Sequence, residues 1–337
     1  MGLGCWYLNN VSLHIRTWMR GLGRKYVFGP VFSRRLGLSL GVNNIPYKVC
    51  TYSCIYCQLG RTLTLSIERR PYSEPERVAD EVVDALEEVG RVDYVTIVPD
   101  GEPTLDTRIG NLIKAIKRAS GERVAVLTNG SLLWLEDVRE ALAEADLVSV
   151  KVDAGDEATW RRVDKPHKAL SFKQVFEGME TFAKDYGGVL ITETMLVEGV
   201  NDSVENAEAV ASMISRLSPA VAYVMVPTRP PAEEWVRAPP RERVREFVST
   251  LEGAGLRVVP LVKGEEKPPR CGADIVSCVL DTIKVHPLPL DHVEALARER
   301  GASLDEVLAK ALSADGVELA EFGGRRFLVW RPRRVKD

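Results

Sequence analysis

The sequence has no uninterrupted apolar run of the roughly 18 residues that a membrane-spanning helix requires. Residues 188–197 come closest, and Thr and Glu interrupt them. The first twenty residues carry scattered Arg and His and have no apolar stretch followed by a cleavage site, so a secretory signal is not expected. We therefore predict a cytoplasmic protein with no membrane partner.

The sequence also has no strong charge imbalance and no low-complexity tract. A net charge of -3 and a pI near 6.0 give no whole-chain signature of nucleic-acid binding, although a local basic patch is compatible with them. Hydrophobic residues make up 45% of the chain and charged residues 28%. A chain of this composition can bury a sizeable core, which excludes a disordered protein.

Cysteine is scarce, with six residues among 337, and three of the six lie between positions 50 and 57. This distribution argues against a disulfide scaffold and for a metal site. Cys271 and Cys278 are too few to ligate a second cluster unless Cys5 and another group join them. We expect these two residues to be either buried free thiols or a disulfide.

From residue 36 onward, apolar runs of strand length alternate with amphipathic stretches of helix length, the pattern of βα units around a parallel sheet. Six such units are too few for a closed eight-stranded barrel. We therefore predict an α/β protein whose residues 26–263 form an open, partial (β/α)6 TIM-like barrel, with its chemistry at the carboxyl ends of the strands. The predicted strands are residues 36–43, 92–99, 123–128, 147–153, 189–197 and 222–227, with a final strand at 257–262.

The two ends of the chain do not continue this alternation of strand-length and helix-length segments. Residues 1–25 are interpreted as an N-terminal extension and residues 264–278 as a polar linker. Residues 279–337 predict three helices and two short strands, which resemble a winged-helix domain, although many three-helix modules share this pattern. Arginines near the predicted wing would contact nucleic-acid phosphates, or the module would bind a peptide or subunit.

The strongest motif is CxxxCxxC, formed by Cys50, Cys54 and Cys57, which allows three thiolates of a short loop to face one centre. A structural zinc site would need a fourth ligand nearby and a ferredoxin cluster a fourth Cys, and the loop contains neither. Three ligands on a [4Fe–4S] cluster leave one iron open. The amino and carboxylate groups of S-adenosylmethionine can chelate that iron.

This motif, with Tyr56 before its last Cys, resembles the radical S-adenosylmethionine superfamily. The resemblance implies a [4Fe–4S] cluster on the three cysteines, S-adenosylmethionine as cosubstrate and Tyr56 over the adenine. Further segments resemble a poorly characterised archaeal and bacterial group of iron–sulfur oxidoreductases, related to tRNA-wybutosine and nitrogenase-cofactor biosynthesis enzymes. These segments are residues 29–62, 100–105, 128–133 and 227–234.

The turn at Gly101, Glu102 and Pro103 resembles the GGE motif of the superfamily, whose backbone and carboxylate hold the methionine amino group. Asp100 stands where the motif has its first Gly. Alone, such a sequence is usually only a turn, but its position after the cysteine loop and a predicted strand favours a functional role. Asn129, which follows the next strand, is either a cofactor ligand or a capping group.

Two later strands carry polar residues that the resemblance places around the cofactor. Lys151 and Asp153 lie two apart and point to one face of their strand. The resemblance implies that they hold the ribose hydroxyls and the methionine carboxylate, with a structural ion pair as the alternative for Lys151. Glu193 on the following strand is a further candidate ligand, or else a satisfied core group.

Two loop residues are candidates for contact with the substrate. His167 lies in a long loop after the fourth strand, and Arg229 lies in the Pro-rich loop after the sixth. Arg229 could clamp a carboxylate or a phosphate through two hydrogen bonds. Either residue could instead be a solvated or loop-fixing side chain.

The predicted reaction begins when an external reductant resembling ferredoxin or flavodoxin delivers one electron to the cluster. Cleavage of S-adenosylmethionine then yields a 5′-deoxyadenosyl radical, which abstracts hydrogen from the substrate. The substrate is an RNA, if the C-terminal module forms a positive face, or a peptide or protein, if that module presents an apolar groove. A cluster-containing, redox-sensing DNA-binding regulator is the alternative from another class, and it would not bind S-adenosylmethionine.

Overall fold

A computed structural model describes residues 25–263, 267–269, 271 and 274–331; the last six residues and all of the predicted N-terminal extension except Lys25 lie outside these ranges. Its main element is an eight-stranded sheet in the order β1-β2-β5-β6-β7-β8-β9-β10. β1 pairs antiparallel with β2, and the other neighbours pair parallel. The strands are β1 (Val27–Ser33), β2 (Gly37–Val42), β5 (Tyr94–Ile97), β6 (Val124–Leu127), β7 (Leu147–Lys151), β8 (Val189–Met195), β9 (Val221–Met225) and β10 (Val258–Leu261).

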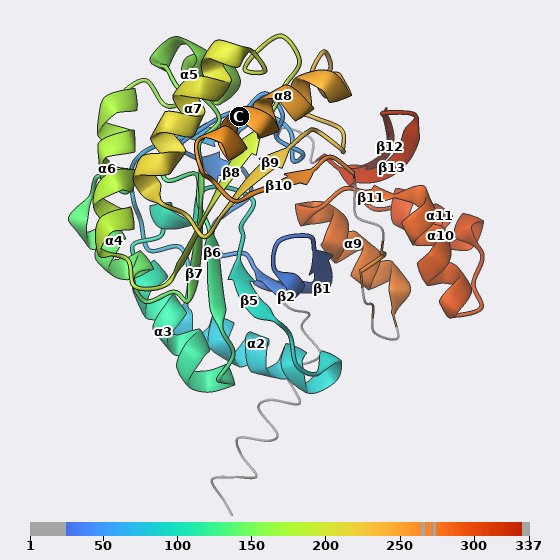
Figure 1. The fold of residues 1–337 in the computed structure, drawn as a ribbon. Coiled ribbons are helices and arrows are strands. Elements are labelled where there is room, and N and C mark those ends of the chain that lie inside the picture. The colour runs from blue at the N-terminus through green and yellow to red at the C-terminus, as the bar shows by residue number, and fades with distance from the viewer. Residues whose placement is uncertain (1–24, 264–266, 270, 272–273, 332–337) are drawn as a thin grey trace, which may run out of the picture.

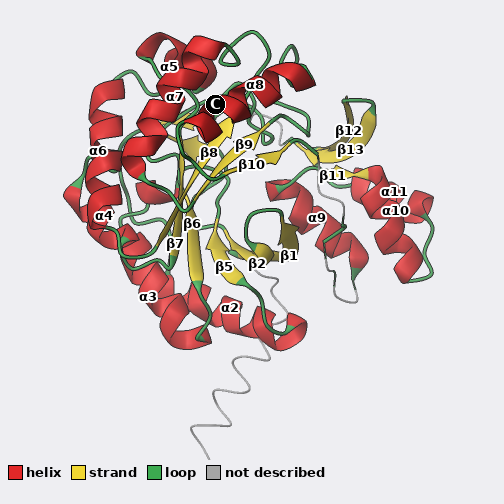
Figure 2. Ribbon diagram, in the orientation of Figure 1, coloured by secondary structure: helices red, strands yellow, loops and turns green. Residues whose placement is uncertain are grey.

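Helices cover the outer side of this curled sheet, as Figures 1 and 2 show. They are α2 (Pro75–Val89), α3 (Ile109–Ser120), α4 (Glu136–Leu142), α5 (Glu157–Val163), α6 (Phe172–Asp185), α7 (Val204–Leu217) and α8 (Arg241–Gly253). The predicted partial TIM-like barrel is confirmed. Within the described residues, no helix has both the length and the apolar character that crossing a bilayer requires.

Several short elements were not predicted. β1 adds an antiparallel edge, and the ring of Phe28 fills the space beside Gly41, where a Cβ would overlap it. The helix α5 lies in the loop expected to be irregular. The other unpredicted elements of the barrel each span only two or three residues, too few to show a repeating hydrophobic pattern. They are β3 (Val49–Cys50), β4 (Thr64–Leu65) and the 3-10 helix η2 (Pro103–Leu105).

The C-terminal module contains the predicted helices and strands in the predicted order. They are α9 (Ile275–Val285), β11 (Leu288–Pro289), α10 (Leu290–Glu299), α11 (Leu304–Leu312), β12 (Val317–Phe322) and β13 (Arg325–Trp330). The strands form a sheet in the order β11-β13-β12. β11 was not predicted, and α9 begins inside the segment interpreted as a linker. Whether the module is a winged helix stays a prediction.

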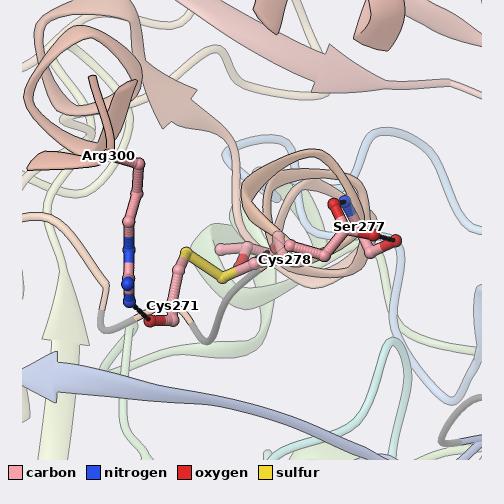
Figure 3. The surroundings of a disulfide bond; sticks show 6 residues. Cys271, Ser277, Cys278 and Arg300 are labelled. Carbon is pink, nitrogen blue, oxygen red and sulfur yellow. Dashed lines mark hydrogen bonds between the residues drawn. A yellow bond between two sulfur atoms is a disulfide. The ribbon is translucent and has the colours of Figure 1, made fainter. Parts of the chain in front are cut away.

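Cys271 and Cys278 form a disulfide (Figure 3), so the disulfide alternative is the correct one. Cys278 lies on α9, and the carbonyl of Cys271 accepts a hydrogen bond from the Arg300 guanidinium at 3.3 Å. The disulfide therefore links the segment before α9 to that helix.

The module packs beside the open edge of the barrel, with α9 next to β1 (Figure 1). Trp330 contacts Tyr47 edge to face, with ring centroids 4.7 Å apart. The side chain of Gln58, next to the last cysteine of the motif, donates to the carbonyl of Val285 at 3.3 Å. The module thus reaches the cysteine loop directly.

The barrel and the module have separate hydrophobic cores. Leu328 is fully buried in a cluster that consists only of residues from the C-terminal module. Its partner across the sheet, Leu319, is 45% exposed on the edge strand β12.

We predict that Leu328→Ala destabilises the module by about 2 to 5 kcal/mol, because truncation leaves a cavity in a closed core. Leu319→Ala, the matched control, should cost no more than about 0.5 kcal/mol. Hydrogen exchange with peptide resolution would measure both, and faster exchange should be confined to residues beyond 274. Equal effects of the two substitutions would contradict the separate core.

Candidate active site

A cavity of about 360 Å³ opens at the carboxyl ends of the barrel strands. The predicted site residues that line it are Cys50, Cys54, Tyr56, Cys57, Gly101, Glu102, Asn129, Lys151, Glu193 and Arg229. Three others, Pro103, Asp153 and His167, are not among the described residues of its wall. One loop and five strand ends therefore meet at one cavity, as parallel strands require.

The three motif cysteines carry free thiols and share the wall of this cavity. Burial raises the pKa of Cys50 to about 12 and that of Cys54 well above its ordinary value. The ammonium of Lys48 donates to the sulfur of Cys57 at 3.1 Å. In the described part of the chain, no three or more His, Cys, Asp and Glu side chains are arranged to hold a single metal ion. Three thiols around a cavity are the donor set of an iron–sulfur cluster, and the site fits that group.

The backbone of the Asp100–Glu102 turn packs directly on the cysteine loop. A Cβ on Gly101 would overlap the carbonyl oxygen of Val49, so only glycine permits this approach. The amide of Glu102 donates to that carbonyl at 3.1 Å, and the amide of Lys48 donates to the carbonyl of Asp100 at 3.2 Å. This turn therefore fixes the start of the cysteine loop.

The Glu102 carboxylate is held by protein donors. It accepts from the backbone amide and hydroxyl of Thr104, at 3.1 and 2.6 Å, and from the amide of Asn129 at 2.9 Å. The hydroxyl of Thr128 donates to it as well. Burial raises the pKa of Glu102. In the structure this carboxylate joins the end of β5 to the end of β6. Its contact with a methionine amino group stays a prediction.

Asn129 supports the cysteine loop from the neighbouring strand end. Its side-chain amide donates to the hydroxyl of Thr51 at 2.7 Å and lies 3.8 Å from the sulfur of Cys50. Its oxygen accepts from the amide of Ser131 at 2.9 Å. Asn129 thus has the capping role named above while also lining the cavity.

Tyr56 lies between the cavity and a pair of buried carboxyl groups. Its hydroxyl contacts Asp153 and donates to Asp164 at 3.1 Å. Asp153 also accepts from the amide of Met195 at 2.6 Å. Burial and the neighbouring Asp153 raise the pKa of Asp164 well above its ordinary value. Asp153 therefore holds Tyr56 and the backbone of β8, and a direct ribose contact stays a prediction.

Lys151 contributes both to the cavity wall and to this buried group. Its ammonium lies 4.9 Å from the ring centroid of Tyr56 and 3.5 Å from Asp153, so the ion pair named as an alternative exists. Burial alone would lower the pKa of Lys151, but Asp153 and Glu193 outweigh it and raise it. Lys151 is therefore charged at the edge of the cavity.

Glu193 pairs with Arg35, a residue of the turn between β1 and β2. Its carboxylate also accepts from the hydroxyl of Ser149 at 2.6 Å. Burial alone would raise the pKa of Glu193, but Arg35 and Lys151 outweigh it and lower it. Glu193 is thus a satisfied, charged group that also faces the cavity.

The two substrate-side candidates lie in different surroundings. Arg229 lines the cavity, donates to Gln58 at 3.0 Å and contacts the imidazole of His286. The amide of His167 donates to the carbonyl of Thr51 at 2.8 Å, and its imidazole accepts from the amide of Ala169 at 3.3 Å. His167 therefore supports the cysteine loop from outside the cavity.

The sequence interpretation missed three cationic or imidazole residues of the cavity wall: Arg34, Arg35 and His286. The Arg-Arg pair directly before the first predicted strand was an available signal. His286 offered none, because only the tertiary packing of α9 brings it to the barrel.

A family profile described as the radical SAM superfamily matches residues 44–210 of this chain. A UPF0026 protein of Methanocaldococcus jannaschii is 36% identical over 306 residues, which cover 90% of this chain and 95% of that protein. A probable dual-specificity RNA methyltransferase of a Synechococcus strain is 25% identical over 235 residues, covering 66% of each chain. A radical SAM methyltransferase from Sphaerobacter thermophilus superposes with a TM-score of 0.50 at 18% identity, covering 66% of each chain.

We predict that Gly101→Ala displaces the cysteine loop, because its Cβ would overlap the Val49 carbonyl. After anaerobic reconstitution, its iron content should fall to less than about half that of the wild type, while far-ultraviolet circular dichroism stays unchanged. Gly187→Ala, between α6 and β8, is the matched control, since a Cβ there meets open space and its φ lies outside the left-handed region. Full iron loading of Gly101→Ala would contradict the predicted role.

Asp100 should make stability depend on pH. Burial raises its pKa to about 7, and one of its oxygens has no hydrogen-bond partner among the described residues. Because the folded state holds this proton more tightly than the unfolded state, stability falls as pH rises from about 4 to 7.

We predict that Asp100→Asn removes this loss, on the order of 4 kcal/mol, and is more stable than the wild type at pH 8 but not at pH 4. Urea denaturation at both pH values measures the difference. A stability difference that is independent of pH would contradict the assignment.

Proposed function

Because the chain belongs to the radical S-adenosylmethionine superfamily and is an enzyme of that type, we propose that Cys50, Cys54 and Cys57 ligate a [4Fe–4S] cluster. The observation that carries this proposal is that all three thiols face one cavity, whose wall also contains Tyr56 and Glu102. The cluster, when bound, supplies the electron that cleaves S-adenosylmethionine to methionine and a 5′-deoxyadenosyl radical. A ferredoxin or a flavodoxin-like protein would deliver that electron from outside.

The side chains of the cavity wall would hold S-adenosylmethionine in distinct ways. Tyr56 is the candidate for the adenine, while the Gly101 backbone and Glu102 are candidates for the methionine amino group. Lys151 is charged and suits the methionine carboxylate. Asn129 and Glu193 complete the polar wall. Pro103 and Asp153 would act from behind it, Asp153 by orienting Tyr56.

We propose an RNA nucleotide as the substrate. Support comes from the methyltransferase relative, which by its description acts on RNA, and from the arginines of the cavity wall. The module surface adds less support than the sequence suggested, because Arg325 pairs with Asp291 and Arg331 with Glu318. Because the chain belongs to an enzyme superfamily, we favour an enzyme over the redox-sensing DNA-binding regulator.

We predict that the anaerobically reconstituted protein releases 5′-deoxyadenosine when dithionite and S-adenosylmethionine are added. Replacing any one of Cys50, Cys54 and Cys57 by Ala should reduce the iron bound and abolish this release, because each thiol holds a corner of the cluster. Liquid chromatography with mass spectrometry measures the nucleoside.

The double variant Cys271→Ser, Cys278→Ser is the matched control, since these sulfurs are bonded to each other outside the cavity. It should keep both the iron and the release of nucleoside. Zinc in place of iron in the wild type, or undiminished release from a motif variant, would refute the proposed function.

A further inference from the structure

We propose that Lys48 acts on the cluster through Cys57: its ammonium donates a hydrogen bond to the Cys57 sulfur and compensates the negative charge that the cluster gains on reduction. The inference rests on the proposed function, because it takes the three motif cysteines as the ligands of a [4Fe–4S] cluster. It adds a residue that sets how readily the enzyme takes up its electron.

Lys48 is a buried lysine whose side chain ends at a motif cysteine. The residue is 3% exposed, and its ammonium donates to the Cys57 sulfur at 3.1 Å. The ammonium forms no salt bridge with any carboxylate of the described residues. Burying a charge costs free energy unless a partner compensates it. The partner that the fold provides here is a sulfur of the proposed cluster site.

The backbone holds Lys48 in an uncommon conformation. Its φ is 57°, in the left-handed region that residues with a Cβ rarely adopt. Its amide donates to the carbonyl of Asp100 at 3.2 Å, and its carbonyl accepts from the amides of Leu63 and Thr64, both at 3.1 Å. These hydrogen bonds fix the direction of the side chain. Glycine adopts this conformation at no steric cost, so the backbone by itself does not require a lysine.

The ammonium approaches the sulfur from outside the cavity. Cys57 lines the cavity, whereas Lys48 is not among the described residues of its wall. Lys151, by contrast, lines the cavity and has its ammonium 3.5 Å from Asp153. Lys48 therefore contacts neither substrate nor S-adenosylmethionine in the proposed reaction. It is a positioning residue that acts through the sulfur.

The other two motif sulfurs have neighbours of a different kind. The side-chain amide of Asn129 lies 3.8 Å from the first sulfur, and the second donates to the carboxyl group of Asp164 at 3.3 Å. Among the described residues that form hydrogen bonds with the three sulfurs, Lys48 is therefore the cation. Its charge is directed at Cys57.

The side chain of Lys48 carries its charge at neutral pH. Burial alone would lower the pKa of Lys48, but Cys57, Cys50 and Cys54 outweigh it and raise it. Because the ammonium is already charged and already in contact with the sulfur, no proton has to move when the electron arrives. One electron leaves the external reductant and enters the cluster, and no bond of Lys48 forms or breaks.

A cation in this position favours the reduced cluster. The net charge of a cluster and the hydrogen bonds to its sulfurs set its reduction potential. Reduction makes the cluster more negative by one charge, so a fixed cation stabilises the reduced form more than the oxidised form. Water screens a buried charge poorly, which strengthens this difference. We therefore expect Lys48 to raise the reduction potential.

Lys165 provides a matched control. Its φ is 43°, also in the left-handed region, and its carbonyl accepts from the amide of Ser53 at 3.1 Å, so it too supports the cysteine loop. Its ammonium, however, pairs with Glu233 at 2.7 Å instead of a sulfur. Removing that charge leaves the neighbours of the three sulfurs in place.

The wild type, Lys48→Met, Lys48→Arg and Lys165→Met are reconstituted anaerobically, and their iron content is measured. Redox titration without S-adenosylmethionine, followed by electron paramagnetic resonance of the reduced cluster, then gives each potential. Lys48→Met should be lower than the wild type by at least about 60 mV, which corresponds to a tenfold change in a one-electron equilibrium. Lys48→Arg, which keeps the charge, and Lys165→Met should each shift by less than half of this amount.

Each outcome separates this inference from the proposed function. An unchanged potential in Lys48→Met at normal iron content, or an equal fall in Lys48→Arg or Lys165→Met, would overturn the role of Lys48 and leave the proposed function intact. Loss of iron from both Lys48 variants would overturn it as well, because Lys48 would then be structural. Loss of iron from Lys48→Met alone would support it, since the cluster would then require the cation. A wild type without a cluster would refute the proposed function itself.

Discussion

The contact of the Asp100–Glu102 turn with the cysteine loop is the constraint on which the rest of the site depends. The loop has almost no regular structure of its own, and its start is held by two backbone hydrogen bonds to that turn. Gly101 permits them because it has no Cβ. Once the loop start is fixed, Cys50 follows within two residues, and the other thiols can face the same cavity.

The remainder of the loop is held by polar groups from other strand ends. Asn129 supports it through Thr51, and Asp153 and Asp164 support it through Tyr56. Burying a polar group costs free energy unless its hydrogen bonds are made. Here the hydrogen bonds that satisfy these buried groups are the same ones that hold the loop in place. Several residues that first suggest cofactor contacts thus also fix the loop that carries the three motif cysteines.

The parts of the site that depend on short-range order were predictable from the sequence. The cysteine spacing is local, and the strands of the barrel carry continuous apolar runs, so their polar ends at Glu102, Asn129 and Glu193 could be placed at one edge. Asp153 followed the same rule but points behind Tyr56, because Tyr56 and the Met195 amide hold it there. The hydrophobic periodicity of a sequence predicts which strand a residue belongs to. It does not predict which residue its side chain will contact.

The missed residues depend on long-range packing. Asp164 meets Tyr56 only because the loop that carries α5 folds back on the cysteine loop, where the amide of Ser53 donates to the carbonyl of Asp164. Arg35 reaches Glu193 because β1 turns back along β2, an edge too irregular to predict. No local pattern contains either contact.

The C-terminal module supplies a part of the cavity that the barrel lacks. An open barrel leaves a gap beside its first strand, and the radical intermediate of the proposed reaction would need that gap closed to water. Val285 and His286 stand in the wall there, and Gln58 links this helix end to the cysteine loop. Because Gln58 also accepts from Arg229, one side chain connects the cysteine loop, the loop after β9 and the module. Movement of the module would therefore change the cavity wall and the surroundings of Cys57 together.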